Sequence, residues 1–107
     1  MRFRPHVWVP ALELHLRTSC IEAADEYGAR RELPKNYEEF ETNAFRHFDD
    51  RIKSVEQGLS DGDDRTNLHD SVELLKREFR SGSRPDLQNM ARDLHVKLLQ
   101  KVRPPSS

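Results

Sequence analysis

The stretch from Tyr37 to Leu59 most constrains the fold, because its large apolar residues recur at steps of three and four. That spacing places them on one side of an α-helix. The stripe consists of Tyr37, Phe40, Ala44, Phe48, Ile52, Val55 and Leu59. Most residues between them are charged, as is typical of a solvated helix face. Asn36 is placed to cap the start of this helix, and Gly58 marks its end.

Three further stretches show helical spacing, over residues 11–31, 66–80 and 85–102. In the first, Leu12 and Leu16 lie in line, and we interpret Leu14 and Ile21 as broadening the same apolar face. Because Leu12, Leu14 and Leu16 alternate with polar residues, an extended conformation of the first turn stays an alternative. Ser83 is expected to cap the last helix. The sequence therefore predicts an all-α fold, either a small four-helix bundle or paired helical hairpins.

Residues 1–10 are predicted to form an extended N-terminal arm ahead of a helical domain at 11–103 and a disordered tail at 104–107. Residues in the arm alternate as in a strand, and Pro5 interrupts the pattern. The arm either folds back onto the helices or reaches across to a second copy. Its candidate interface residues are Phe3, Val7, Trp8 and Val9.

The chain has 107 residues, the size of one domain, and only 35% of them are hydrophobic. A short chain with so few apolar residues and long amphipathic helices often completes its core by pairing, so we predict a homodimer. Cys20 is the only cysteine, which fits a reducing compartment such as cytoplasm or nucleus. We expect no secretory signal and no association with a membrane.

Acidic and basic residues are concentrated in different parts of the sequence, although the net charge of the whole chain is only −1. Residues 22–64 contain 13 acidic and 6 basic side chains, whereas residues 76–103 contain 8 basic and 3 acidic ones. The basic residues are Lys76, Arg77, Arg80, Arg84, Arg92, Lys97, Lys101 and Arg103. Arg77, Arg80 and Arg84 follow helical steps and are candidates for a ridge that tracks the phosphate backbone of duplex RNA or DNA.

No pattern in the sequence assembles a catalytic site. His69 and Glu73 are four residues apart, a spacing that can hold a metal, but the further ligands of known helical metal sites are missing. Asp50 follows His47 by three residues and is placed to bond it, which more often makes a local ion pair than a general base. We therefore expect no enzyme, no cofactor and no bound metal.

These observations favour a regulatory or adaptor protein that acts by binding itself and another protein. The alternative is a nucleic-acid-binding protein that uses the basic residues of the last two helices.

Overall fold

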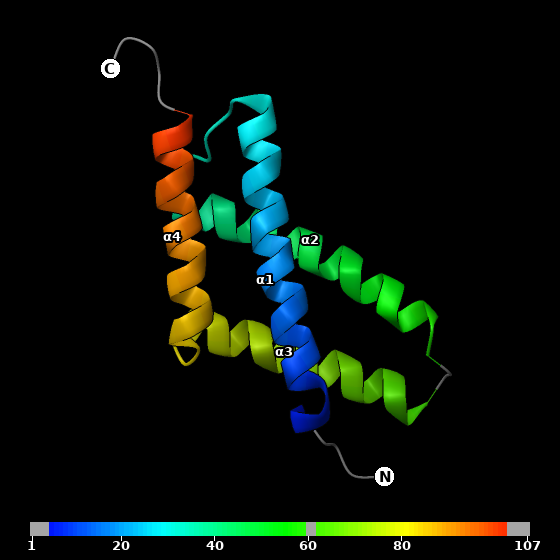
Figure 1. Cartoon of the computed structure of the whole chain (residues 1–107). Helices are drawn as coiled ribbons and strands as arrows, with labels where there is room; N and C mark the ends of the chain where they lie inside the picture. Colours follow the sequence, from blue (N-terminus) through cyan, green and yellow to red (C-terminus); the bar gives the residue numbers. More distant parts are fainter. Residues whose placement is uncertain (1–4, 60–61, 103–107) are drawn as a thin grey trace.

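The computed structural model describes residues 5–59 and 62–102, with side chains described from Pro10 onward. Regular structure in these residues is entirely helical (Figure 1). The helices are α1 (Pro5–Arg30), α2 (Tyr37–Gln57), α3 (Asp63–Ser81) and α4 (Pro85–Lys101). The predicted all-α fold with four helices is confirmed.

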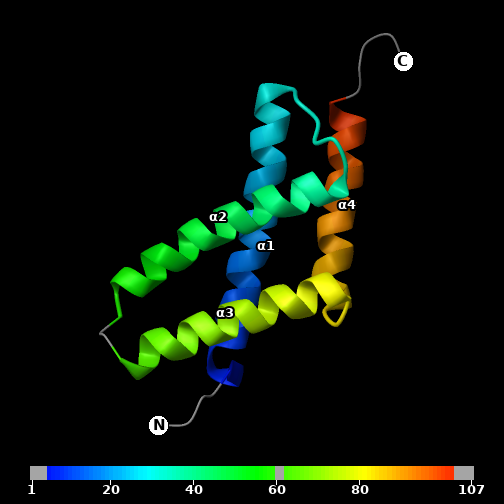
Figure 2. The same ribbon diagram turned by 180° about the vertical axis from the view of Figure 1, so that it is seen from behind.

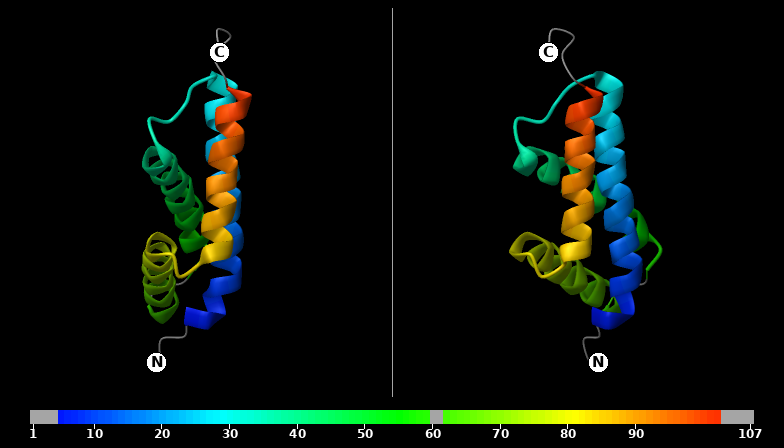
Figure 3. Two further views of the ribbon diagram at one scale, coloured as in Figure 1. Left: turned by 90° about the vertical axis from the view of Figure 1, so that its left-hand side faces the viewer. Right: turned by 60° about the vertical axis from the view of Figure 1, so that its left-hand side comes forward.

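The four helices form two layers that cross obliquely. Figure 3 shows α1 and α4 side by side in one layer, running in the same direction. Figure 2 shows α2 and α3 antiparallel in the other layer, laid across α1 and α4. The backbones of α2 and α3 make few close contacts with each other, and each helix packs on α1.

The core lies between the two layers, and α1 supplies its centre. Leu12, Leu16, Cys20 and Ala23 of α1 are each at most 1% exposed. The other layer contributes Phe40, Ala44, Phe45, Phe48, Ile52, Leu68, Val72, Leu75 and Phe79. From α4 come Leu87, Ala91 and Leu98. The predicted stripe of α2 is thus the largest aromatic part of the core.

Helix ends agree with the sequence where a local side-chain bond fixes them. Asn36 caps α2 as predicted, since its Oδ1 accepts a hydrogen bond of 2.9 Å from the Glu39 N–H. The predicted Ser83 cap of α4 is wrong, because Arg84 occupies the N-cap position and the Ser83 hydroxyl pairs with that of Ser81. The third helix begins at Asp63, earlier than the predicted Thr66, because acidic residues suit the first turn.

The predicted extended arm is corrected for residues 5–10, which form the first turns of α1. Proline is tolerated at the first helical position, and the helix satisfies backbone groups for which no partner strand exists. Pro10 lies inside the helix, and Figure 3 shows the first turn bent away from the axis of α1. Val7, Trp8 and Val9 are helical in backbone, but their side chains lie outside the description.

Phe3 and residues 103–107, including Arg103 and the predicted tail, also fall outside the described residues. The interface assigned to the N-terminal residues therefore stays a prediction.

The buried position of Leu16 leads to a stability prediction. Leu16→Ala should lower the free energy of unfolding by about 2–5 kcal/mol, because it opens a cavity between the layers. Leu33→Ala, at a residue 37% exposed in the loop after α1, is the matched control and should cost less than about 1 kcal/mol. Urea unfolding at fixed protein concentration measures both values. Equal losses for the two variants would contradict the core described above.

Candidate functional site

The side of α1 that faces away from the core is also apolar. Leu14 is 64% exposed and Ile21 is 46% exposed. Each is two positions away from buried residues of the same helix. Two positions correspond to a rotation of about 200° around the helix axis. We call Ala11, Leu14, Thr18 and Ile21 the outer stripe; it has no charged member and its steps of three and four match a helix-pairing seam.

The interpretation of Leu14 and Ile21 as part of the inner face is therefore wrong. Rotation of about 100° per residue carries both to the opposite side from Leu12, Leu16 and Ala23. Leu14 and Ile21 are seven residues apart, which is about two helical turns. This spacing is the signal in the sequence for a second apolar side. On α4, Val96 is 49% exposed and, by the same spacing from Leu98, also faces away from the core.

Most basic residues of α3 that were predicted to form a ridge have partners on other segments. Lys76 Nζ lies 2.5 Å from Asp49 Oδ1 on α2. Arg80 Nε lies 3.3 Å from Glu41 Oε1, also on α2. Of these three α3 residues, Arg77 is the one without an ion pair in the described part of the chain, and it is exposed.

Arg84 and the basic residues of α4 are also engaged. Arg84 contacts Glu13 at 2.7 Å and Glu78 at 2.9 Å and is partly buried. The Arg92 guanidinium carbon lies 4.4 Å from the centre of the Tyr37 ring, Lys97 pairs with Asp93 at 3.1 Å, and the Lys101 side chain lies near Gly28. The predicted cations are thus brought to several faces rather than to one track. Phosphate-backbone binding stays an alternative prediction, and this arrangement disfavours it.

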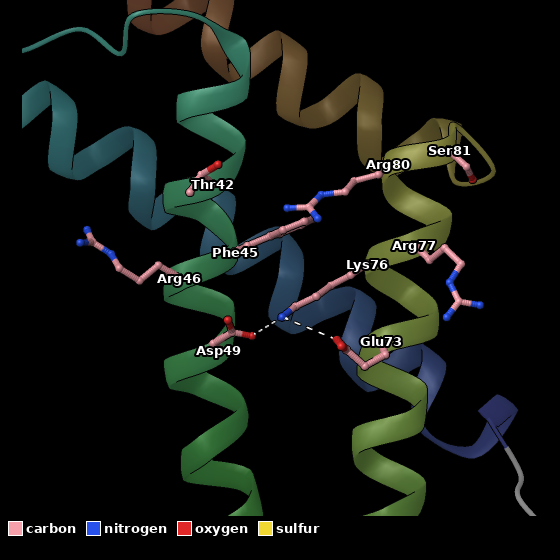
Figure 4. A pocket seen from close by; sticks show the side chains of 9 residues that line it. All are labelled: Thr42, Phe45, Arg46, Asp49, Glu73, Lys76, Arg77, Arg80 and Ser81. Carbon is pink, nitrogen blue, oxygen red and sulfur yellow. Dashed lines mark hydrogen bonds and ion pairs between the residues drawn. The ribbon is translucent and has the colours of Figure 1, made fainter.

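An open groove of about 940 Å³ separates α2 from α3 (Figure 4). It is lined by Thr42, Phe45, Arg46, Asp49, Glu73, Lys76, Arg77, Arg80 and Ser81. Phe45 is 5% exposed, and two cations cover its ring. Figure 4 shows Lys76 reaching between Asp49 and Glu73, while Arg77 points away from α2. This α2–α3 groove combines charged walls with a narrow aromatic floor.

The histidines singled out in the sequence lie against glutamates of neighbouring helices. His69 Nε2 lies 2.7 Å from Glu56 on α2, rather than pairing with Glu73. His47 lies 3.4 Å from Glu26 on α1, rather than pairing with Asp50. Among the side chains described, at residues 10–59 and 62–102, no three from His, Cys, Asp or Glu are placed to hold one metal ion.

Cys20, Tyr37 and His95 are titratable groups in or beside the core. Burial raises the pKa of the Cys20 thiol to about 12, which leaves it a weak nucleophile. Burial and the nearby Glu41 raise the pKa of Tyr37 to about 12. The His95 ring packs edge-on against Tyr37 with centroids 5.8 Å apart. Burial, and then Arg92, lower the pKa of His95. These shifts keep all three groups uncharged near neutral pH.

No protein-family model, no curated protein and no solved structure matches the chain. A search of the described helices for a segment long and apolar enough to cross a membrane finds none.

The position of His95 predicts a loss of stability in mild acid. Its pKa is lower in the folded protein than the ordinary 6.5, so the unfolded chain binds more protons as pH falls through that value. The free energy of unfolding should therefore decrease as pH falls below about 6.5.

Urea unfolding between about pH 7.5 and pH 5.5 tests this, with His95→Gln expected to flatten the dependence. His69→Gln is the matched control, at a histidine whose side chain is 61% exposed. An unchanged pH dependence in His95→Gln would rule out the effect.

Proposed function

We propose that this protein is a non-enzymatic binding protein, regulatory or adaptor in role, that assembles as a homodimer through the outer stripe of α1. The observation that carries the proposal is that α1 is apolar on two opposite sides. Its inner side fills the core, and its outer side exposes Leu14 and Ile21. Large apolar side chains that are exposed together on one side of a helix favour a partner that covers them.

A second copy of the chain fits that surface because the outer stripe is self-complementary. Leu14 and Ile21 flank Thr18 at nearly equal distances along the helix. A two-fold axis near Thr18 therefore brings Leu14 of one copy to Ile21 of the other, as an isologous contact requires. At this contact, no charged residue of the outer stripe faces the same residue of the second copy. The net charge of −1 also gives little repulsion between chains.

The regulatory or adaptor role is supported by what the remaining titratable groups do. The buried groups are held uncharged, and Lys76, Arg80 and Arg84 form ion pairs between helices. The features of this fold that best suit a function are therefore its binding surfaces.

Light scattering on a size-exclusion column tests the dimer. At micromolar concentration the wild-type protein should have twice the mass of a single chain, which is 12.6 kDa. Leu14→Glu combined with Ile21→Glu should weaken dimerisation by about 100-fold or more, because it buries charge at the seam.

Leu33→Glu supplies the matched control, since it adds the same charge at an exposed leucine outside the outer stripe. It should remain dimeric. A wild-type monomer, or a dimer that persists in the double variant, would refute the proposal.

A further inference from the structure

The α2–α3 groove is a second surface, separate from the outer stripe. The backbones of α2 and α3 run side by side without close packing, and side-chain contacts such as Lys76–Asp49 and Arg80–Glu41 bridge them. The floor is Phe45, which also contacts Phe79 of α3 with ring centroids 5.4 Å apart. The walls are polar and carry four basic and two acidic residues. A groove of this composition favours an anionic occupant.

Arg80 is held in a position that suits a carboxylate ligand. Its guanidinium carbon lies 4.8 Å from the centre of the Phe45 ring, a cation–π contact that fixes the plane of the group. Glu41 accepts from Nε only. The terminal nitrogens make no hydrogen bond within the described residues, although they are the edge that binds carboxylates in bidentate fashion. Arg80 is thus oriented before a ligand arrives.

The other arginines on the groove are exposed and weakly held. Arg46 has one contact of 3.3 Å, to Glu26, and its side chain is 61% exposed. Arg77 is exposed and lies one turn before Arg80 on α3. Ion pairs at such exposed positions contribute little stability and exchange readily with a competing anion. By contrast, the two acids of the groove, Asp49 and Glu73, share one ammonium group on Lys76.

The two acids decide between classes of anion. A nucleic-acid strand carries a charge at every phosphate, so it would bring phosphates against Asp49 and Glu73 in the middle of the groove. A helical peptide can instead place one carboxylate opposite Arg80, another three or four residues away near Arg77 on the outer rim of α3, and a neutral residue opposite the acids. We propose that the α2–α3 groove binds an acidic, amphipathic helical segment of a partner protein. This inference does not depend on the homodimer.

Fluorescence anisotropy with designed peptides tests the inference. The probe is a labelled amphipathic helix of about 16 residues with glutamates at i and i+3 or i+4 spacing. The control peptide carries lysine in place of each glutamate. The full-length chain should bind the acidic peptide, more weakly as salt rises, and should not bind the lysine peptide. Equal binding of the two peptides, or binding of neither, would overturn the inference.

Charge reversal locates the site. Arg77→Glu combined with Arg80→Glu should weaken binding of the acidic peptide by tenfold or more. Lys97→Glu combined with Lys101→Glu makes the same change in net charge on α4 and should leave binding within about twofold, since it acts only at long range. Arg80→Lys keeps the charge but loses the planar donor edge, and should weaken binding by a smaller factor. Equal losses in the two charge-reversed pairs would overturn the site.

An NMR titration of the wild-type chain tests the inference even if a variant unfolds. In the wild-type chain the acidic peptide should shift the amide signals of Thr42, Phe45, Arg77 and Ser81, and leave those of the outer stripe unchanged. Shifts confined to the outer stripe would overturn the inference while leaving the homodimer in place. Tighter binding of a duplex DNA or RNA of similar length at the same groove would assign it to nucleic acid instead.

Discussion

The burial of α1 is the constraint on which the rest of the structure depends. α2 and α3 touch each other little, so each is positioned mainly by its contact with α1. Leu12, Leu16, Cys20 and Ala23 provide that contact surface, and the last two are small enough to let a neighbouring helix approach closely. α4 then packs along the flank of the same helix. The groove between α2 and α3 follows from this arrangement, because both helices pack on α1 and are bridged to each other mainly by side chains.

Charged side chains tie the helices together across that arrangement. Arg51 of α2 holds both carboxylate oxygens of Glu22 on α1, at 3.1 and 2.9 Å, and these hydrogen bonds lower the pKa of Glu22. Arg84 joins the start of α4 to Glu13 on α1 in a similar way. Such partly exposed pairs add modest stability each, but they fix how the helices are placed relative to one another. The uneven charge along the sequence is therefore largely matched within one chain.

Local features could be predicted from the sequence, and features that depend on distant residues could not. The helix starting after Asn36 was predictable because the capping bond to Glu39 spans three residues. The partner of Arg84 was not, since Glu13 lies 71 residues away. The exposed side of α1 was misassigned because apolar residues on two sides of one helix look alike until a core selects one. The helical turns at residues 5–10 were missed because proline and alternation both suggested an extended chain.

The side-by-side packing of α1 and α4 has a consequence for how the chain acquires its structure. These are the first and the last of the four helices, so one layer is complete only when the final helix has been made. A ribosome releases α1 well before α4, and during that interval the flank of α1 that α4 covers stays open to water. Long-range pairing of this kind slows folding and prolongs the exposure of apolar surface.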